Sequence, residues 1–336
     1  MPALAVAEAL RADGAEVSFI GGERAEAQLV PAAGFELRRL QVEGLSRSNP
    51  VRAARAAGLA AAAVPRARRI LSELAPGAVM GGGGYVAGPV GLAAASLRLP
   101  LVLTEADSHL GLTNRLLAPL ARRVCLAFPL RGREGDRYVV TGRPSPAPSA
   151  EREQARRRFG LEAHEICVLV FGGSLGSRTI NTAAAEAFAG APFRVLHVSG
   201  RRDYEELASR ELGEGYELIE YLDLEDFGRA LAAADLAVAR AGGSVFELAS
   251  YGVPSVLVPF PHAAGDHQSS NARWMAEAGA AVVIADGELT GAKLGGEVAA
   301  LLADERRLRA MAGAARSLAR PRAAADVADE LLEAAR

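Results

Sequence analysis

Short apolar segments rich in β-branched residues alternate with longer helical patterns along almost the whole chain. Parallel strands need crossover connections, which are usually helices, so this alternation predicts an α/β fold with parallel sheets covered by helices on both faces. The predicted strands are 17–20, 36–40, 78–80, 101–104, 124–127 and 138–141 in the first half, and 167–171, 194–198, 217–221, 236–239, 255–258 and 281–284 in the second.

A proline-rich segment, 142–149, interrupts the alternation. Its three prolines in five positions sustain neither a helix nor a central strand. We therefore predict a linker here, between two doubly wound, Rossmann-like domains that cover 1–145 and 150–318. The amphipathic stretch from about 305 onward, which ends in a helix at about 319–336, is expected to pack back across the first domain. Ligands of such sheets bind beyond the carboxyl ends of the strands, so we expect the site in a cleft that the two domains face.

The first domain opens unusually, because a helical pattern precedes its first predicted strand. A doubly wound domain normally begins with a central strand and a tight loop, and here neither is present. We expect that the first strand is missing because the chain as written begins downstream of the natural start.

The whole chain has a net charge of −2, yet arginine exceeds acidic residues in its first half. This excess is compatible with an anionic surface or substrate, or with chance, and nucleic acid is not indicated. No segment reaches the length of a membrane span and no signal peptide opens the chain, so we expect a cytoplasmic protein that can still sit on a membrane face. Cys125 and Cys167 are expected to be buried free thiols.

Glycine-rich turns follow three predicted strands, at 81–84, 172–177 and 241–244. Glycine lets main-chain N–H groups approach a phosphate, and the start of a helix favours its charge. Glu247, one turn into the helix after the third turn, is placed to take a ribose hydroxyl, and amide side chains follow at Asp266-His-Gln-Ser-Ser-Asn271. The alternatives are tight turns without a ligand, and the second turn lacks the G-x-G-x-x-G spacing of a dinucleotide site.

Two acidic residues, Glu105 and Asp107, follow the strand 101–104, where a doubly wound domain presents its active site. One of them is a candidate general base for a sugar hydroxyl, and helix capping is the alternative for Asp107. His262 and His267 flank Asp266, but their spacing is not that of metal ligands, so we expect no metal. The basic, alanine-rich stretch 51–69 is either a solvated helix face or a contact with anionic lipid.

Five motifs, in order, resemble those of glycosyltransferase family 28, in particular its UDP-N-acetylglucosamine transferases that act on undecaprenyl-diphospho-muramoyl-pentapeptide in peptidoglycan synthesis. The motifs are Gly-Gly-Tyr-Val-Ala-Gly-Pro at 83–89, Glu-Ala-Asp with Gly-Leu-Thr-Asn-Arg at 105–115, Phe-Gly-Gly-Ser-Leu-Gly-Ser at 171–177, Arg-Ala-Gly-Gly-Ser with a glutamate at 240–247, and His-Gln-Ser-Ser-Asn-Ala at 267–272. The resemblance covers essentially the whole chain. It implies the GT-B fold, an inverting transfer without metal or other cofactor, and peripheral work at the cytoplasmic face of a bacterial cell membrane.

The resemblance also implies a set of residues that bind UDP-N-acetylglucosamine. They are Arg143, Gly173, Ser174, Leu222, Gly242, Gly243, Ser244, Glu247, Gln268 and Asn271. Within this set, Gly173 and Ser174 would face the diphosphate, Glu247 the ribose and Gln268 the sugar, and the Leu222 backbone would line the uracil pocket. Glu105 and Asp107 would face the sugar and the acceptor as catalytic candidates.

The sequence departs from the family in several places. The family's opening strand and its Gly-Gly-Thr-x-Gly-His loop, whose histidine is a catalytic candidate, would precede Met1. Family His-Glu-Gln-Asn reads Thr-Glu-Ala-Asp at 104–107, Leu175 replaces a glutamine, and Arg143 stands near the family's Asn-Pro-x-Arg. Another GT-B glycosyltransferase, an epimerase and a non-catalytic UDP-sugar-binding protein therefore stay open as alternatives.

Overall fold

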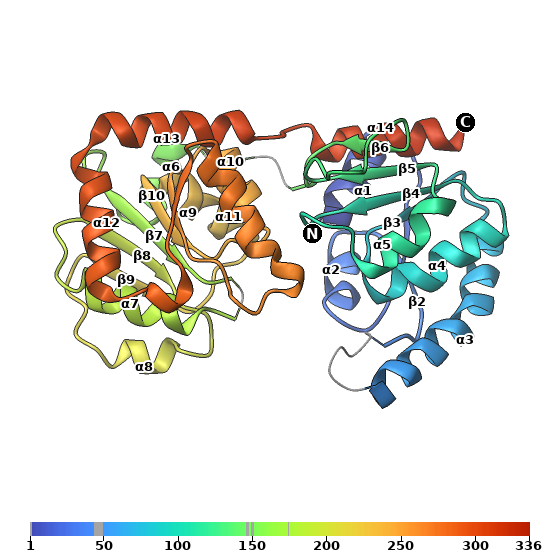
Figure 1. Cartoon of the computed structure of the whole chain (residues 1–336), viewed down its shortest axis with the longest axis horizontal. Coiled ribbons are helices and arrows are strands. Elements are labelled where there is room, and N and C mark those ends of the chain that lie inside the picture. Colours follow the sequence, from blue (N-terminus) through green and yellow to red (C-terminus); the bar gives the residue numbers. More distant parts are fainter. Residues whose placement is uncertain (1, 44–49, 146–147, 149–150, 174) are drawn as a thin grey trace. The chain divides into compact units, whose positions relative to one another are not determined.

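The computed structural model describes every residue except 1, 44–49, 146–147, 149–150 and 174. The chain forms two compact units (Figure 1): Met1–Ser145 together with Arg320–Arg336, and Pro146–Ala319. The boundary falls within the proline-rich segment 142–149, part of which lies outside the described residues.

The first unit contains two parallel sheets. β1 pairs with β2, and four further strands follow the order β3-β4-β5-β6. Its elements are α1 (Pro2–Ala12), β1 (Ser18–Gly21), α2 (Glu26–Ala32), β2 (Glu36–Arg39), α3 (Pro50–Leu74), β3 (Val79–Gly81), α4 (Gly84–Ser96), β4 (Leu101–Glu105), α5 (Leu112–Leu117), the short 3-10 helix η1 (Ala118–Leu120), β5 (Arg123–Leu126), β6 (Tyr138–Val140) and α14 (Ala323–Ala335).

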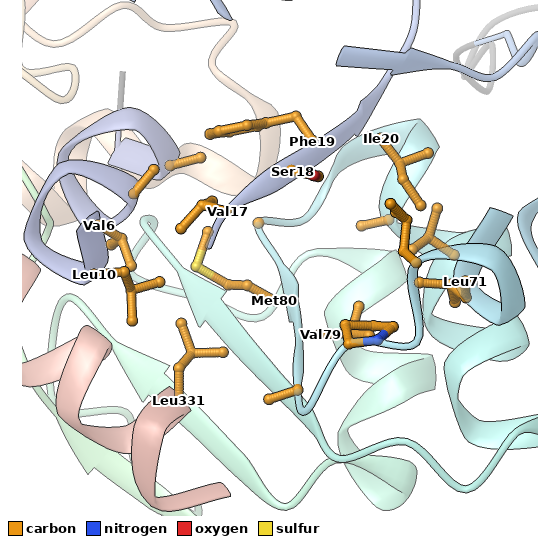
Figure 2. Close-up of a pocket in the computed structure, with 18 of the residues that line it drawn as sticks. Val6, Leu10, Val17, Ser18, Phe19, Ile20, Leu71, Val79, Met80 and Leu331 are labelled. Carbon is orange, nitrogen blue, oxygen red and sulfur yellow. The ribbon is translucent and has the colours of Figure 1, made fainter. Parts of the chain in front are cut away.

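A cavity of about 510 Å³ lies between the two sheets of the first unit. Figure 2 shows Phe19 of β1 on one side of it and Val79 and Met80 of β3 on the other, with Val6 of α1 and Leu331 of α14 nearby. Among the described strands, β1 pairs only with β2 and β3 only with β4. The cavity thus occupies the position that a central strand fills in a doubly wound sheet of order 3-2-1-4-5-6.

The last helix, α14, covers one face of the four-stranded sheet in the first unit. Val327 and Leu331 pack with Val6 and Val102 in one apolar cluster, and the Glu330 carboxylate accepts a hydrogen bond from Arg123 on β5 at 2.9 Å. The preceding helix, α13 (Glu305–Leu318), instead packs on α10 within the second unit. The prediction that the whole stretch from about 305 packs on the first domain is therefore wrong for α13, because an amphipathic pattern does not specify its partner.

The second unit is a single six-stranded parallel sheet in the order β12-β11-β10-β7-β8-β9, with helices around it. Its elements are α6 (Arg152–Arg158), β7 (Cys167–Phe171), α7 (Arg178–Phe188), β8 (Arg194–Val198), α8 (Tyr204–Ala208), β9 (Tyr216–Ile219), α9 (Leu224–Ala233), β10 (Leu236–Ala239), α10 (Val245–Tyr251), β11 (Ser255–Leu257), η2 (Ala264–Asp266), α11 (His267–Glu277), β12 (Ala281–Val283), η3 (Asp286–Glu288), α12 (Gly291–Ala303) and α13.

The two central strands of this sheet, β7 and β10, consist entirely of buried residues. Continuous apolar runs of this kind are typical of parallel strands that are covered on both faces. Val168 and Val170 of β7 and Val238 of β10 pack with Ile180 and Phe188 of α7 in the main core cluster. The strand order reverses between β7 and β10, so the turns after these two strands lie at the position where doubly wound sheets bind ligands.

Candidate functional site

The chain turns sharply after β7, through Gly172–Ser177, and then enters α7. Gly176 has a φ of 75°, and a Cβ atom there would lie 1.9 Å from the Ser199 carbonyl oxygen, so only glycine fits. Ser177 begins the helix as its N-cap, where its Oγ accepts from the Ile180 N–H at 3.5 Å. This turn therefore brings main-chain amides to the start of an 11-residue helix, an arrangement that suits a phosphate group.

One of the two residues predicted to face the diphosphate lies in this turn. Gly173 lies in it with a φ of 92°, whereas Ser174 lies outside the described residues. Leu175, which stands where the family has glutamine, is 74% exposed. The side chain that departs from the family therefore projects into solvent and takes no part in the core.

A second glycine turn follows β10 and brings several predicted residues together. Gly242, Gly243 and Ser244 lead directly into α10. Asn271, on α11, is 1% exposed and its Nδ2 donates to the Ala241 carbonyl oxygen at 3.0 Å. The helix that carries the predicted amide side chains is thus attached to the predicted nucleotide turn.

Gln268 lies one turn before Asn271 on α11 and borders the same glycines. A Cβ atom on Gly242 would lie 3.8 Å from the Gln268 Nε2, and the Gln268 Oε1 accepts from the Phe260 N–H at 2.9 Å. Glu247 is half-buried in the first turn of α10. An amide side chain therefore borders the second glycine turn, and a carboxylate lies in the first turn of the helix that follows it.

Arg240 is a residue of this site that the sequence analysis missed. Its guanidinium is almost buried and donates to the carbonyl oxygens of Val258 (3.1 Å) and Pro259 (3.2 Å) and to Thr179 Oγ1 (2.7 Å), and it pairs with Asp286 at 2.5 Å. Val258 and Pro259 follow β11, Thr179 lies in the first turn of α7 after β7, and Asp286 follows β12. One side chain thus connects four strand ends around the candidate site, and an arginine directly before Ala-Gly-Gly was the only signal in the sequence.

One predicted residue of the second unit, Leu222, lies apart from this group in the sheet. Leu222 follows β9, the edge strand, so β8 and β7 separate it from β10 in the sheet. Arg143 belongs to the first unit, after β6, whereas the other residues predicted to bind UDP-N-acetylglucosamine belong to the second.

The first unit has its own polar cluster at the end of β4. Glu105 is 7% exposed, and its carboxylate accepts hydrogen bonds from the N–H groups of Asp107 (3.1 Å) and Gly111 (2.8 Å) and from Asn114 Nδ2 (2.9 Å). These bonds fix the loop between β4 and α5. All three hydrogen bonds come from the segment 107–114, so we assign Glu105 a loop-positioning role.

Asp107 is more accessible than Glu105. It is half-buried, and among the described residues its carboxylate has no hydrogen-bond or ion-pair partner. The helix that follows this loop, α5, contacts the glycine turn after β3, because Thr113 Oγ1 donates to the Gly84 carbonyl oxygen at 3.0 Å. Asp107 is therefore the acidic residue of this cluster that is free to meet a substrate.

The described residues contain no group of three or more His, Cys, Asp or Glu side chains that could hold a metal ion. Within the same part of the chain, none of the helices is long and apolar enough to span a membrane. Cys125 and Cys167 are both free and buried, and burial raises the pKa of each thiol to about 12.

Comparison with known proteins links these sites to one family. The N-terminal domain of glycosyltransferase family 28 matches residues 1–126, and the C-terminal domain matches 167–330. A Rubrobacter xylanophilus UDP-N-acetylglucosamine--N-acetylmuramyl-(pentapeptide) pyrophosphoryl-undecaprenol N-acetylglucosamine transferase is 46% identical over 98% of this chain and 99% of its own length. The Moorella thermoacetica protein of the same name is 42% identical over 95% of this chain and 91% of its own length.

A solved structure agrees with these matches. The crystal structure of Acinetobacter baumannii MurG superposes with a TM-score of 0.80 at 30% identity, over 99% of this chain and 95% of that one. The sequence motifs, the two parallel-sheet units and the matched relatives all lead to the same assignment. The chain belongs to glycosyltransferase family 28.

Proposed function

We propose that this protein transfers N-acetylglucosamine from UDP-N-acetylglucosamine to a lipid-linked N-acetylmuramyl pentapeptide, with inversion at the anomeric carbon. The observation that carries the proposal is the meeting of the Gly242–Ser244 turn with Gln268 and Asn271 at the switch point of the second sheet. We take the two proposed substrates, UDP-N-acetylglucosamine and the lipid-linked muramyl pentapeptide, from the names of the matched relatives.

In this proposal the second unit holds the donor. The amides of the Gly172–Ser177 turn, with Gly173 and Ser174, receive the diphosphate, and the start of α7 favours its charge. Gly242, Gly243 and Ser244 border the nucleotide. The remaining contacts are Glu247 to the ribose, Gln268 to the sugar, the Leu222 backbone to uracil, and Arg143 from the first unit. Asn271 supports the nucleotide turn from behind through its bond to Ala241.

The acceptor hydroxyl attacks the anomeric carbon while a base removes its proton, and the bond from that carbon to the UDP oxygen breaks. Negative charge then develops on the departing diphosphate, where fixed main-chain dipoles stabilise it without reorganisation. No metal or other cofactor takes part. Asp107 is our candidate base, because the Glu105 carboxylate is occupied by the loop that it holds.

We assign the acceptor and the membrane contact to the first unit. One face of α3 is buried through Ala56, Ala63, Ala67 and Leu71. Three arginines of the same helix, at 66, 68 and 69, are exposed. An exposed basic face on a helix with a buried apolar stripe suits an anionic membrane surface. The proposed place is the cytoplasmic face of a bacterial cell membrane, where the protein acts peripherally in peptidoglycan synthesis and thus in cell shape and division. Nucleic acid has no part in it.

A transfer assay tests the proposal directly. The protein is incubated with radiolabelled UDP-N-acetylglucosamine and lipid-linked muramoyl pentapeptide, and label is followed into the lipid fraction. We expect labelled lipid and an equal amount of UDP. Epimerised sugar nucleotide without labelled lipid would show an epimerase, and tight binding without any turnover would show a non-catalytic UDP-sugar-binding protein.

A further inference from the structure

A buried polar network lies directly behind the predicted diphosphate turn. His197 on β8 is fully buried, and its ring nitrogens contact Tyr216 Oη on β9 (2.6 Å) and Asn181 Oδ1 on α7 (3.0 Å). Asn181 is 1% exposed, and its Nδ2 donates to the Ser199 carbonyl oxygen (2.9 Å) and to Asp203 Oδ2 (3.0 Å). Neither His197 nor Asp203 has a role in the proposed reaction.

The partners fix where each proton of this network lies. Ser199 and Asp203 offer only acceptors to Asn181, so the amide must turn its NH₂ group toward them and its oxygen toward His197. An oxygen cannot donate, so the His197 Nε2 carries the proton. The neutral ring then accepts at Nδ1 from the Tyr216 hydroxyl. A single arrangement therefore satisfies all the groups: Ser199 and Asp203 set the orientation of the Asn181 amide, and the His197 Nε2–H holds the amide there by donating to its oxygen.

This orientation controls the backbone that supports the diphosphate turn. Ser199 and Gly200 lie against Gly176, since a Cβ atom on Gly200 would be only 2.3 Å from the Gly176 nitrogen. The Asn181 amide holds this segment through the Ser199 carbonyl. Asp203 holds the residues after Gly200 to the start of α7, because its carboxylate pairs with Arg178 of that helix and with Arg202, both at 3.2 Å. A shift of the loop after β8 must therefore displace Gly176 and the amides of its turn.

We propose that His197 is a positioning residue for the donor diphosphate: its Nε2–H holds the Asn181 side chain in place, and Asn181 in turn holds Ser199 and Gly200 against the turn at Gly176. The inference rests on the proposed function, since it takes the Gly172–Ser177 turn as the diphosphate site. The ligand recognised is the diphosphate of a nucleoside diphosphate, and its nucleoside part lies elsewhere on the sheet edge.

Two conservative substitutions separate this role from simple filling of space. His197→Gln places an amide N–H where the imidazole Nε2–H stands, so it keeps the donor to Asn181 and loses the contact with Tyr216. His197→Asn is shorter and reaches toward Tyr216 but not toward Asn181. Tyr216→Phe is the control, because it removes the hydroxyl and leaves the bond from His197 to Asn181 in place.

Affinities for UDP and for uridine are measured by calorimetry or by competition for each variant of the full chain. We expect His197→Asn to lower the affinity for UDP about tenfold, which corresponds to the loss of one well-placed hydrogen bond. The affinity for uridine should change little. His197→Gln should stay within about threefold of the parent for both ligands. Tyr216→Phe should lower the melting temperature without changing the ratio of UDP to uridine affinity.

The inference is overturned if His197→Asn keeps the parental ratio of UDP to uridine affinity, or if His197→Gln loses as much of that ratio as His197→Asn does. A parallel loss of affinity for UDP and for uridine would show general disorder of the second unit, and this result would also overturn the inference. If the parent protein itself does not bind UDP more tightly than uridine, the proposed function fails, and that outcome is visible before any variant is made.

Discussion

At the residue scale, the same type of side chain serves different purposes according to its partners. Glu105 and Asp107 are only two positions apart, yet the first holds a loop with three hydrogen bonds and the second keeps its carboxylate open. The sequence could not separate a base from a loop-holding carboxylate, because both follow the strand in the same pattern. Arg240 and His197 were missed for a related reason, since only tertiary partners distinguish a buried charge or imidazole from a surface one.

Asp107→Asn and Glu105→Gln should therefore differ in kind. If Asp107 is the base, Asp107→Asn should lower kcat at least about 100-fold, the usual contribution of a general base, with an unchanged melting temperature. Glu105→Gln should lower the melting temperature, because a neutral amide accepts the loop's hydrogen bonds more weakly. Steady-state kinetics and thermal unfolding check the pair. An Asp107→Asn protein with parental kcat would remove Asp107 from the mechanism.

His197 should make stability depend on pH in a defined window. Burial lowers its pKa to about 4 in the folded chain, against about 6.5 when unfolded. The unfolded chain then binds the proton more readily, so the stabilisation is complete above pH 6.5 and is lost as pH falls toward 4. The loss between pH 7.5 and 5 should be about 2 kcal/mol.

Urea unfolding at these two pH values measures this effect, with His197→Gln as the reference that cannot titrate. Carboxylates such as Asp203, whose pKa is lowered mainly by its arginine partners against the effect of burial, change both proteins alike and cancel in the comparison. Equal pH slopes in the parent and in His197→Gln would show that the ring is not buried in the neutral form.

At the element scale, the pattern of apolar runs was sufficient to find the strands. All twelve predicted strands are present, because each run is bounded by glycine, proline or a helical pattern. Some strand ends differ from the prediction by one or two residues: the strand predicted at 217–221 is β9, Tyr216–Ile219. Helix partners could not be predicted, and α13 packs on α10 in the second unit although its amphipathic pattern resembles that of α14. Periodicity shows that a helix has a buried face, but the surface that covers this face depends on the whole fold.

The cavity between β1 and β3 should accept an added strand. The Val79 N–H donates to the Pro100 carbonyl oxygen, directly before β4. Successive amides of a strand point to opposite sides, so the Met80 N–H points toward the cavity. Leaving such a buried group unpaired costs about 1–3 kcal/mol, and most of the side chains that line the cavity are apolar. A designed extension of five apolar residues and a short glycine–serine link, joined ahead of Met1, should raise the melting temperature by about 5 °C.

Hydrogen exchange locates the added strand. The amides of Ile20 and Met80 should become protected in the extended protein, and an extension with two prolines, which lack donors, should protect neither. Unchanged exchange at both positions with the apolar extension would show that the cavity does not take a strand.

At the scale of the whole molecule, each unit brings its own part of the chemistry. The second unit gathers Gly242, Gln268 and Asn271 at one switch point. The first unit presents Asp107 on the loop between β4 and α5. The fold class could be predicted from the alternation of strand and helix patterns, and the glycine turns could be found because they are local features at strand ends. The polar networks behind them join residues from three or four strand ends, so no local pattern announces them.

The central claim is that main-chain amides and a few polar or charged side chains hold a uridine diphosphate sugar without a metal. Calorimetric titration of the full chain with UDP-N-acetylglucosamine, once with magnesium and once with excess EDTA, tests it most directly. The account predicts saturable binding with the same dissociation constant in both solutions. Binding that disappears with EDTA, or no heat with UDP sugars while a nicotinamide or flavin nucleotide binds, would contradict it.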